Sequence, residues 1–422
     1  MAVGELATVV KGCPRCGKRF RCADGAAGCW CEAVSLTRGA LDEIRELADD
    51  CLCAGCLGEF SSRDAAAGEK RWAKARPDAH IRARGVPAVW WAGGIAFLLG
   101  AMLLGLANGP VSIGAWGILE SALSHVPLIH VRSHLDSADS AIVWQLRAPR
   151  VVLAALVGGM LAVAGSAYQG VFRNPLADPY LLGVAAGAGL GATIAIAYIS
   201  TSGSTPVLPI AAFAGAIVGV ALAYSLGRSV GGILGTGTLL LAGVTVAAFM
   251  TAVQTFVQQE HSDTLREVYA WLLGGFAGST WHDVVLVLPY IAVSSTVIVL
   301  HRRLLDVLSV GDEEATALGL HVRRVRFLIV VAATAGTAAA VSVSGLIGFV
   351  GIIVPHTVRL LVSTSYRAVV PLSLIVGGGF LVVADLLART VMSPAELPIG
   401  VVTAFFGAPF FAVVLRTMRR SA

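Results

Sequence analysis

The sequence predicts an all-α polytopic membrane protein that carries a small cysteine-rich domain at its N-terminus. Of the 422 residues, 56% are hydrophobic and 14% are charged, and the mean hydropathy is +0.78. Soluble domains carry about 25% charged residues. The shortage is local, because 14 of the 31 Lys and Arg residues and all eight cysteines lie within residues 1–87. The composition excludes a disordered chain, a secreted disulfide scaffold and an ordinary soluble enzyme.

Apolar segments after residue 87 set the number of expected membrane helices. A helix needs about 20 apolar residues to cross the hydrocarbon core of a bilayer. Ten segments meet or approach this length: 88–106, 151–171, 180–199, 207–229, 237–258, 284–300, 326–346, 347–363, 369–388 and 399–416. A shorter apolar stretch at 269–278 is expected to be re-entrant or interfacial. The first 87 residues are polar, so we expect no cleavable signal peptide.

Three parts of the chain follow from this pattern. We expect a cytoplasmic cysteine-rich domain at 1–70, a basic linker at 71–87 and a ten-helix membrane domain at 88–420. Glycines recur at helical spacing inside several spans, among them Gly158, Gly165 and Gly351. Small residues let helix backbones approach closely in lipid. The membrane domain is therefore expected to be a tightly packed helical bundle.

The positions of the basic residues predict the orientation in the membrane. If the N-terminus is cytoplasmic, ten spans return the C-terminus to the cytoplasm, with 26 Lys and Arg residues inside and 5 outside. Without the long N-terminal segment the counts are 12 inside and 5 outside. Cytoplasmic loops carry the excess of Lys and Arg. Both termini are therefore predicted to be cytoplasmic.

The cytoplasmic segment 301–326 contains a short helical signal between two basic clusters. Acidic residues begin at Asp312 and a glycine follows at Gly319, as in a short helix with a complemented dipole. Such a helix, attached to membrane spans at both ends, could be moved by a cytoplasmic partner. A plain solvated loop is the alternative.

Six motifs taken together resemble the FecCD/BtuC family, the permease subunits of bacterial ABC importers for iron–siderophore chelates, haem and cobalamin. The resemblance covers about residues 88–420 in order, with the ten spans of the family. Each motif is weak alone, but six in register are specific. They are Arg147-Ala-Pro-Arg150, the Gly159–Gly165 run through Gln169, Arg173-Asn-Pro-Leu-Ala-Asp-Pro179, Leu182-Gly-Val184, the acidic segment at 312–319, and Glu396-Leu-Pro-Ile-Gly400.

The resemblance implies a homodimer in the bacterial cytoplasmic (inner) membrane. Two ABC ATPase subunits would bind below a central pathway, and an extracytoplasmic substrate-binding protein would bind above it, with no nucleic-acid partner. The chain has no GxxxxGK[ST] phosphate loop, so ATP hydrolysis is expected in a separate polypeptide and no catalytic residue or bound nucleotide is expected here. The ATPase-coupling helix would comprise Gly311, Asp312, Glu313, Glu314, Ala315, Leu318 and Gly319.

On the outer face, Arg147 and Arg150 match family arginines that pair with carboxylates of the binding protein, and Arg389 would be a third. Guanidinium groups on a charge-poor face can orient an acidic partner by bidentate contacts. Alternatively, Arg147 and Arg150 anchor their helix at the headgroups by snorkelling.

Polar side chains within apolar spans are candidates for the transport pathway, because their burial in lipid is costly. Gln169 and Gln258 are the candidates, whereas Gln254 is expected to pack between helices and Asp385 to lie near the outer interface. The cargo stays open among ferric siderophore, haem and cobalamin, in that order of preference. A secondary transporter or a metal-responsive sensor is disfavoured, since the span centres lack a charge pair and no output domain follows the last span.

The cysteine pattern predicts metal binding in the N-terminal domain. Eight thiols without a nearby histidine suit two zinc sites of four cysteines each, formed by Cys13, Cys16, Cys22, Cys29, Cys31, Cys51, Cys53 and Cys56. Gly17 would permit the bend of a zinc knuckle. An iron–sulfur centre and disulfides are alternatives, although cytosolic thiols stay reduced. Metal ligation would supply much of the folding free energy of so small a domain.

The cysteine-rich segment also resembles the small CWC proteins, through Cys29-Trp30-Cys31. That resemblance implies no known activity. The domain is either a passive appendage that folds around zinc or a regulator that contacts the ATPase or reports metal or redox state. We also expect a helix over Leu36–Asp50 and, in the basic linker, proximity to anionic lipid.

Overall fold

The chain forms two compact units, Met1–Gly85 and Val86–Ala422, in a computed structural model. The structure describes residues 9–22, 34, 36, 38–47, 52–61, 86–109, 111–124, 134–199, 207–229 and 236–420. The division between the units falls inside the expected linker, most of which lies outside the described residues.

The first unit contains a two-stranded antiparallel sheet and short helices. Strand β1 (Val9–Gly12) pairs with β2 (Arg19–Cys22), with Val9 opposite Cys22 and Gly12 opposite Arg19. Helix α1 (Arg38–Leu47) lies within the helix expected at Leu36–Asp50, and a further helical segment covers residues 54–61. A small core joins these elements and consists of Cys13, Leu52, Cys53, Cys56, Leu57 and Phe60.

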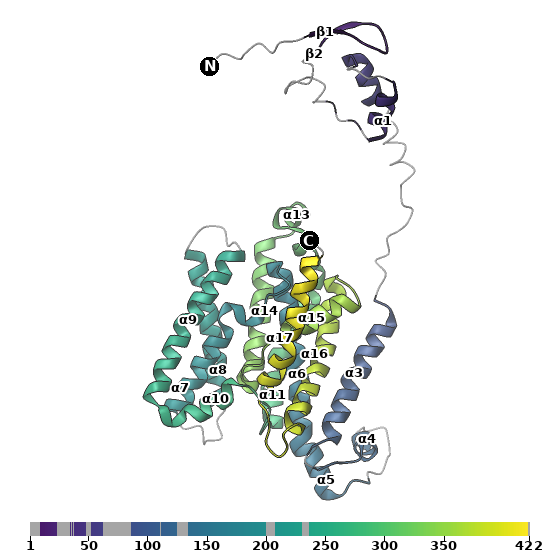
Figure 1. The fold of residues 1–422 in the computed structure, drawn as a ribbon. Coiled ribbons are helices and arrows are strands. Elements are labelled where there is room, and N and C mark those ends of the chain that lie inside the picture. Colours follow the sequence, from purple (N-terminus) through teal and green to yellow (C-terminus); the bar gives the residue numbers. More distant parts are fainter. Residues whose placement is uncertain are drawn as a thin grey trace. The chain divides into compact units, whose positions relative to one another are not determined.

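In the described residues of the second unit, all regular secondary structure is helical (Figure 1). Its elements are α3 (Ala88–Ala107), α4 (Ala115–Ser124), α5 (Ser137–Ala141), the π-helix η2 (Ile142–Arg147), α6 (Ala148–Phe172), η3 (Pro179–Leu182), α7 (Val184–Tyr198), α8 (Val207–Ser229), α9 (Thr236–Glu260), η4 (Ser262–Thr264), α10 (Leu265–Leu272), α11 (Trp281–Leu300), α12 (Arg302–Val310), α13 (Asp312–Ala317), α14 (Val322–Ser344), α15 (Val350–Leu361), α16 (Tyr366–Thr390) and α17 (Ile399–Arg420).

Seven helices in the described parts of the chain are long and apolar enough to span a membrane. One of them is the continuous stretch Ser137–Phe172, which joins α5, η2 and α6 and is longer than the expected span at 151–171. Three shorter apolar helices lie at the other expected positions, namely Val184–Tyr198, Val350–Leu361 and Ile399–Val414. The structure thus confirms a polytopic helical protein, whereas the count of ten spans stays a prediction.

Helix α6 forms the centre of the bundle and packs against α16, α14, α15 and α11. Glycine permits these contacts, because a Cβ on Gly165 would lie 2.0 Å from the carbonyl oxygen of Gly351 in α15. Likewise, a Cβ on Gly187 of α7 would lie 2.2 Å from the carbonyl oxygen of Gly215 in α8. The glycine-rich spans therefore form the close helix packing that the sequence predicts.

Three interruptions of helical structure meet at one place in the bundle. The loop after α10, the end of α14 and the start of α17 exchange backbone hydrogen bonds, from Gly275 N–H to the Ser344 carbonyl (2.8 Å) and from Gly400 N–H to the Leu273 carbonyl (3.0 Å). Non-helical backbone at membrane depth needs such internal partners. The apolar stretch expected at 269–278 is thus the end of α10 followed by irregular chain bound to other elements.

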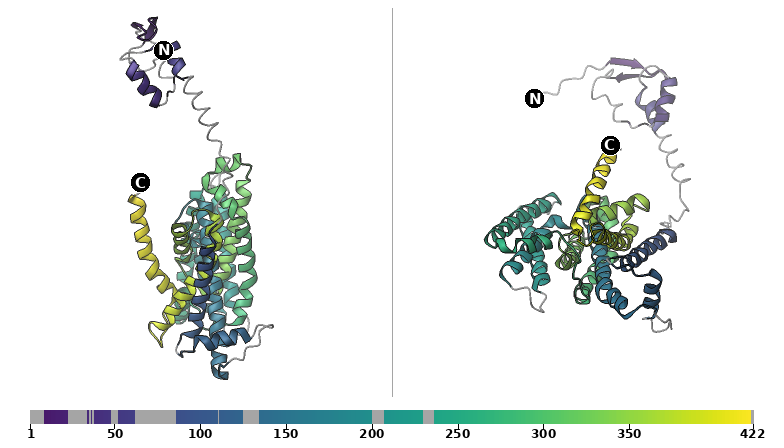
Figure 2. Two further views of the ribbon diagram at one scale, coloured as in Figure 1. Left: turned by 90° about the vertical axis from the view of Figure 1, so that its right-hand side faces the viewer. Right: turned by 60° about the horizontal axis from the view of Figure 1, so that its bottom comes forward.

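The bundle has two distinct ends. Helix α13, the start of α3 and the end of α17 lie at one end, and α4, α5 and α10 lie at the other (Figure 1). Helix α17 diverges from its neighbours toward its C-terminal end (Figure 2). We call the end that contains α13 the α13 end, and the end that contains α4 the α4 end. The polar groups discussed below gather at these two ends.

Candidate functional site

The acidic segment after Gly311 folds as the short helix that the sequence predicts. Asp312, Glu313 and Glu314 form the first turn of α13, where carboxylates complement the helix dipole. At the other end, Leu320 N–H bonds to the Ala315 carbonyl (3.0 Å) and Gly319 N–H to the Thr316 carbonyl (2.9 Å). Gly319 has φ +83°, so these bonds form a Schellman cap in which glycine supplies the left-handed residue. The helix is therefore defined at both ends.

Asp312 attaches α13 to the membrane helices. Its carboxylate accepts two hydrogen bonds from Arg326 in α14, at 2.8 and 3.0 Å, and lies 3.6 Å from Arg173, which follows α6. Neither partner is predicted from the sequence, although Arg326 belongs to the basic cluster 14 residues further along the chain. A force on α13 would thus act on α14 and on the end of α6.

The remaining surface of α13 is open to solvent. Ala315 is buried beneath the helix, whereas Glu313 and Glu314 are exposed and Leu318 is 72% exposed. Two free carboxylates beside an uncovered leucine make a small amphipathic surface at the α13 end. Such a surface is suited to contact with another protein.

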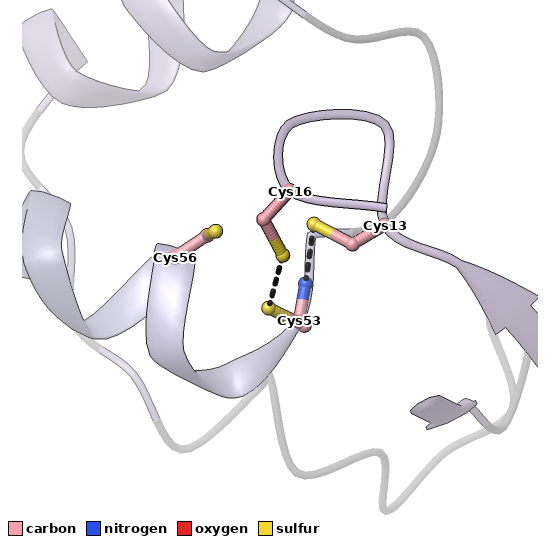
Figure 3. Close-up of side chains that lie close together, drawn as sticks. All are labelled: Cys13, Cys16, Cys53 and Cys56. Atoms are coloured by element: carbon pink, nitrogen blue, oxygen red, sulfur yellow. Dashed lines mark hydrogen bonds between the residues drawn. The ribbon is translucent and has the colours of Figure 1, made fainter. Parts of the chain in front are cut away.

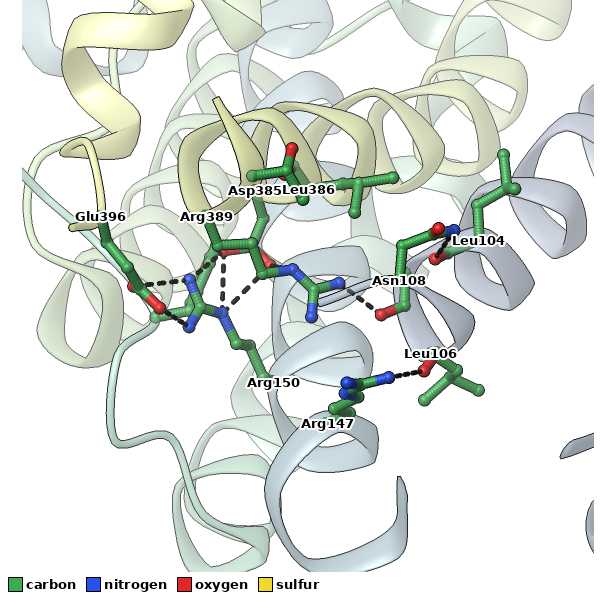
Figure 4. Close-up of polar contacts among 12 residues, drawn as sticks. Leu104, Leu106, Asn108, Arg147, Arg150, Asp385, Leu386, Arg389 and Glu396 are labelled. Atoms are coloured by element: carbon green, nitrogen blue, oxygen red, sulfur yellow. Dashed lines mark hydrogen bonds and ion pairs between the residues drawn. The ribbon is translucent and has the colours of Figure 1, made fainter. Parts of the chain in front are cut away.

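At the α4 end, Arg150 forms the centre of a charged cluster (Figure 4). Its guanidinium binds Asp385 of α16 at 2.8–3.1 Å and Glu396, in the loop before α17, at 2.8 and 3.0 Å. Asp385 is 1% exposed and lies 3.6 Å from Arg389 as well. The cluster therefore joins α6 to α16 and to the loop that connects α16 to α17.

The other two arginines of the predicted docking set bind the end of α3. Arg147 donates to the carbonyls of Leu106 (2.7 Å) and Ala107 (3.1 Å), and Arg389 donates to the carbonyl of Gly105. Both side chains are buried, at 6% and 5% exposure. Carbonyls at a helix C-terminus favour cations. In this conformation these guanidinium groups join η2 and α16 to the end of α3. Their docking role stays a prediction.

The three glutamines of the apolar spans are buried. Gln169 donates to the Gly351 carbonyl (3.0 Å) and accepts from Arg359, so it lies between α6 and α15. Gln254 packs against Gly189 of α7, where a Cβ would lie 2.9 Å from its Oε1. Gln258 is buried near the end of α9. A pathway role for Gln169 and Gln258 therefore stays a prediction.

Four of the eight cysteines come together in the first unit (Figure 3). The sulfur atoms of Cys13, Cys16, Cys53 and Cys56 all lie within 4.8 Å of one another. Gly17, at φ +73°, forms the turn after Cys16, and the Gly17 N–H bonds to the Cys13 carbonyl at 2.9 Å. This is the bend that the sequence predicts for a knuckle.

The surroundings of these thiols fit a metal site. Burial acts to raise the pKa of Cys13, but backbone N–H groups, including that of Cys53 at 3.4 Å, donate to its sulfur and lower this pKa to about 6. The backbone N–H of Cys56 lowers the pKa of Cys53, while burial raises the pKa of Cys56 to about 12. Tetrahedral zinc holds sulfurs at about 2.3 Å, hence about 3.8 Å from one another, which matches this spacing. The four cysteines could bind a metal ion.

The other four predicted metal ligands are not among the described side chains. Cys29, Cys31 and Cys51 lie outside the described residues, as does the side chain of Cys22, whose backbone ends β2. The pairing of the first and last Cys-x2-Cys motifs settles which cysteines share the described site. A second four-cysteine site stays a prediction.

The fold and these sites define a polytopic membrane protein with a cysteine cluster that could bind a metal in its first unit and an exposed short helix at one end of its bundle. The sequence model of the FecCD transport family matches residues 97–417, and that of the cysteine-rich CWC family matches residues 13–58. The chain therefore belongs to the FecCD transport family, as an ABC importer permease of the FecCD/BtuC type.

Individual relatives agree with this assignment. The cobalamin import system permease BtuC of Halobacterium salinarum is 44% identical over 72% of this chain and 82% of its own length. The iron(3+)-hydroxamate import permease FhuB of Bacillus subtilis is 36% identical over 80% of this chain and 85% of its own length. A solved structure, described as an inward-facing metal-chelate type ABC transporter, has a TM-score of 0.68 and 29% identity, and the match covers 78% of this chain and 99% of that one.

Proposed function

We propose that this chain carries a ferric siderophore across the bacterial cytoplasmic membrane, as the permease subunit of an ATP-driven importer with both termini in the cytoplasm. The observation that carries the proposal is the exposed helix α13, set within a FecCD-family bundle and tied to α14 by Asp312. The hydroxamate permease relative and the metal-chelate transporter structure support a bulky metal chelate as cargo. A secondary transporter does not fit the family.

Cobalamin is the second candidate cargo, because the permease with 44% identity imports cobalamin. Haem is the third. Uptake of a radiolabelled ferric hydroxamate siderophore into proteoliposomes, with the cognate binding protein and ATPase, separates these cargoes by competition. Excess unlabelled ferric siderophore should abolish the signal, whereas haem and cobalamin should not. If labelled cobalamin is taken up and labelled ferric siderophore is not, cobalamin replaces the ferric siderophore as the proposed cargo.

We infer that α13 is the coupling helix, which docks in a groove of the ATPase subunit. Glu313 and Glu314 would meet basic side chains, and the exposed Leu318 would enter an apolar pocket. The acidic and apolar character of this surface supports the assignment, since charge complementarity directs such contacts. Gly311 and Gly319 bound the docking segment, and buried Ala315 seats it on the bundle.

The change Glu313→Arg should uncouple ATP hydrolysis from uptake while leaving the protein inserted. Charge reversal at an exposed position alters the surface without disturbing the packing of the bundle. The measurement is ATPase binding and uptake per ATP in proteoliposomes. The control Glu260→Arg reverses an exposed charge at the end of α9, at the opposite end of the bundle, and should leave ATPase binding unchanged. Unchanged coupling in Glu313→Arg would remove α13 from this role.

The proposed assembly also contains a second copy of the chain and an extracytoplasmic binding protein. Helix α17 diverges from the bundle and exposes apolar side chains, including Phe405 and Val413, which supports packing against a second copy. For the binding protein, Arg150 and Glu396 are the members of the charged cluster closest to solvent, with Arg147 and Arg389 behind them. Docking there would exchange internal partners for carboxylates of the binding protein.

For the N-terminal unit we propose zinc at the four described cysteines, as a cofactor that stabilises the fold. Four thiolates with a closed tetrahedral arrangement are typical of structural zinc sites. The small core of this unit includes three of the four cysteines, Cys13, Cys53 and Cys56. Metal binding would therefore contribute directly to its folding free energy.

A further inference from the structure

Helix α12 lies directly before the coupling helix, and the proposed function leaves its role open. Only Gly311 separates α12 from α13. Leu305 and Leu308 form its buried face, which packs against α6 and α16. Because both leucines are fully buried in the main core, α12 is seated in the bundle rather than lying on it.

Asp306 of α12 binds the first turn of α16. Its Oδ1 accepts the backbone N–H of Tyr366 at 2.6 Å, and its Oδ2 accepts the hydroxyl of Ser365, the N-cap residue of α16, at 2.8 Å. Arg367 lies 3.7 Å from the same carboxylate. A carboxylate at a helix N-terminus is favoured by the dipole, and its hydrogen bonds are charge-assisted. Asp306 thus links two helices that are about 60 residues apart in the sequence.

Tyr366 extends this link to two further helices. Its hydroxyl lies 3.3 Å from Arg359 of α15, whose guanidinium lies 5.2 Å from the Tyr366 ring centroid. Arg359 also donates to Gln169 of α6, and Gln169 donates to the Gly351 carbonyl. At the α13 end, therefore, a continuous set of polar contacts joins α12, α16, α15 and α6.

Helix α16 runs from this link to the charged cluster at the α4 end. Its 25 residues correspond to about 37 Å at a rise of 1.5 Å per residue. Asp385 and Arg389 lie near its far end, where Asp385 binds Arg150. Helix α16 thus begins at its contact with α12, the helix before α13, and ends near the charged cluster of Arg150, Asp385 and Glu396.

We propose that Asp306 is a positioning residue that fastens the α12–α13 segment to α16, so that α16 moves with α13 when the ATPase displaces it. The displacement then reaches the Arg150–Asp385 cluster, about 29 Å away by the same helical rise, because 19 residues separate Tyr366 from Asp385. This inference rests on the proposed function, because it takes α13 as the ATPase contact. In this proposal α13 docks to the ATPase, and Asp306 transmits the resulting movement to α16.

The change Asp306→Ala tests the proposal by separating docking from transport. Uptake per ATP hydrolysed should fall at least about tenfold, because both charge-assisted hydrogen bonds of the Asp306 carboxylate are lost, while ATPase binding is retained. Asp306→Asn keeps one acceptor oxygen, so its uptake per ATP hydrolysed should lie between the values of wild type and Asp306→Ala. The control Ser309→Ala removes an exposed hydroxyl whose one partner among the described residues is the Asp306 backbone carbonyl, and it should transport normally. An unchanged ratio in Asp306→Ala overturns the proposal.

A crosslink provides a second test that does not depend on loss of a contact. The double variant Asp306→Cys and Ser365→Cys, once oxidised, should keep coupled uptake, because the two helices move together. Wild type oxidised in the same way controls for its eight native cysteines. If oxidation blocks uptake in the double variant alone, α12 and α16 separate during transport and the inference is wrong. A wild-type chain that binds no ATPase would instead overturn the proposed function, and this inference with it.

Discussion

Buried charges at the α4 end join the helices of the bundle to one another. Asp385 is 1% exposed and lies between Arg150 and Arg389, so each charge there has a partner of opposite sign. Removing one member of a buried ion pair leaves an uncompensated charge, which is far costlier than losing a surface pair. Stability and any docking role are therefore combined in the same side chains.

The change Arg150→Ala should destabilise the protein by about 3–5 kcal/mol, because Asp385 would stay buried without its main partner. The measurement is chemical unfolding in mild detergent. Glu396→Gln, at a carboxylate that is 41% exposed, should cost less than about 1 kcal/mol. Equal stability of Arg150→Ala and wild type would show that the cluster does not hold α6 to α16.

At this scale the sequence predicts residue types better than partners. The basic cluster that contains Arg326 and the place of Asp385 near the end of its apolar segment could be recognised, but the contacts Arg326–Asp312 and Arg150–Asp385 could not. Arg150 and Asp385 are 235 residues apart, and pattern reasoning within one span does not reach a partner on another. The contact between Asp306 and Tyr366 could not be predicted for the same reason, since neither residue belongs to a recognisable pattern within its own segment.

Among the elements, α6 and α15 meet through glycine. Backbone contact at Gly165 leaves no space for a side chain, since a Cβ would lie 2.0 Å from the Gly351 oxygen. Close backbone approach of this kind holds membrane helices together where no hydrophobic driving force acts between them. The helix pair is therefore sensitive to a single methyl group.

The change Gly165→Ala should cost at least about 3 kcal/mol, the upper part of the overpacking range, because the obstructing atom is backbone and cannot rotate away. Unfolding in detergent measures it. Gly100→Ala in α3 is the matched control, since nothing lies within 4 Å of its Cβ position, and it should be neutral or stabilising by about 0.5–1 kcal/mol. Similar values for the two variants would contradict the packing account.

Hydropathy predicts the long helices but not the elements between them. Helix α13 could be located because its acidic start and its glycine cap are local signals. Helix α12 was missed because it is short and amphipathic, and α15 is only 12 residues long because irregular chain precedes it. The π-helix η2, which extends the second span, has no signal in the apolar pattern. Tertiary contacts decide these boundaries.

At the scale of the whole molecule, the two units fold around different cores. Replacing Cys13 and Cys16 together by Ser should release the metal from the first unit and leave the thermal unfolding of the bundle unchanged, because the units have separate cores. Metal content per chain and circular dichroism measure the two effects. Replacing Ser61 and Ser62 by Ala is the matched control and should keep the metal. Full metal content in the cysteine variant would exclude this site.

We infer that the chain transports only when a separate ATPase hydrolyses ATP. The direct measurement is uptake of labelled ferric siderophore, haem and cobalamin, in parallel, by proteoliposomes that contain the permease, its ATPase and its binding protein. We predict uptake of one chelate with ATP and none with a non-hydrolysable analogue or without the ATPase. Equal uptake without the ATPase, or failure of any ATPase to bind the permease, would contradict the claim.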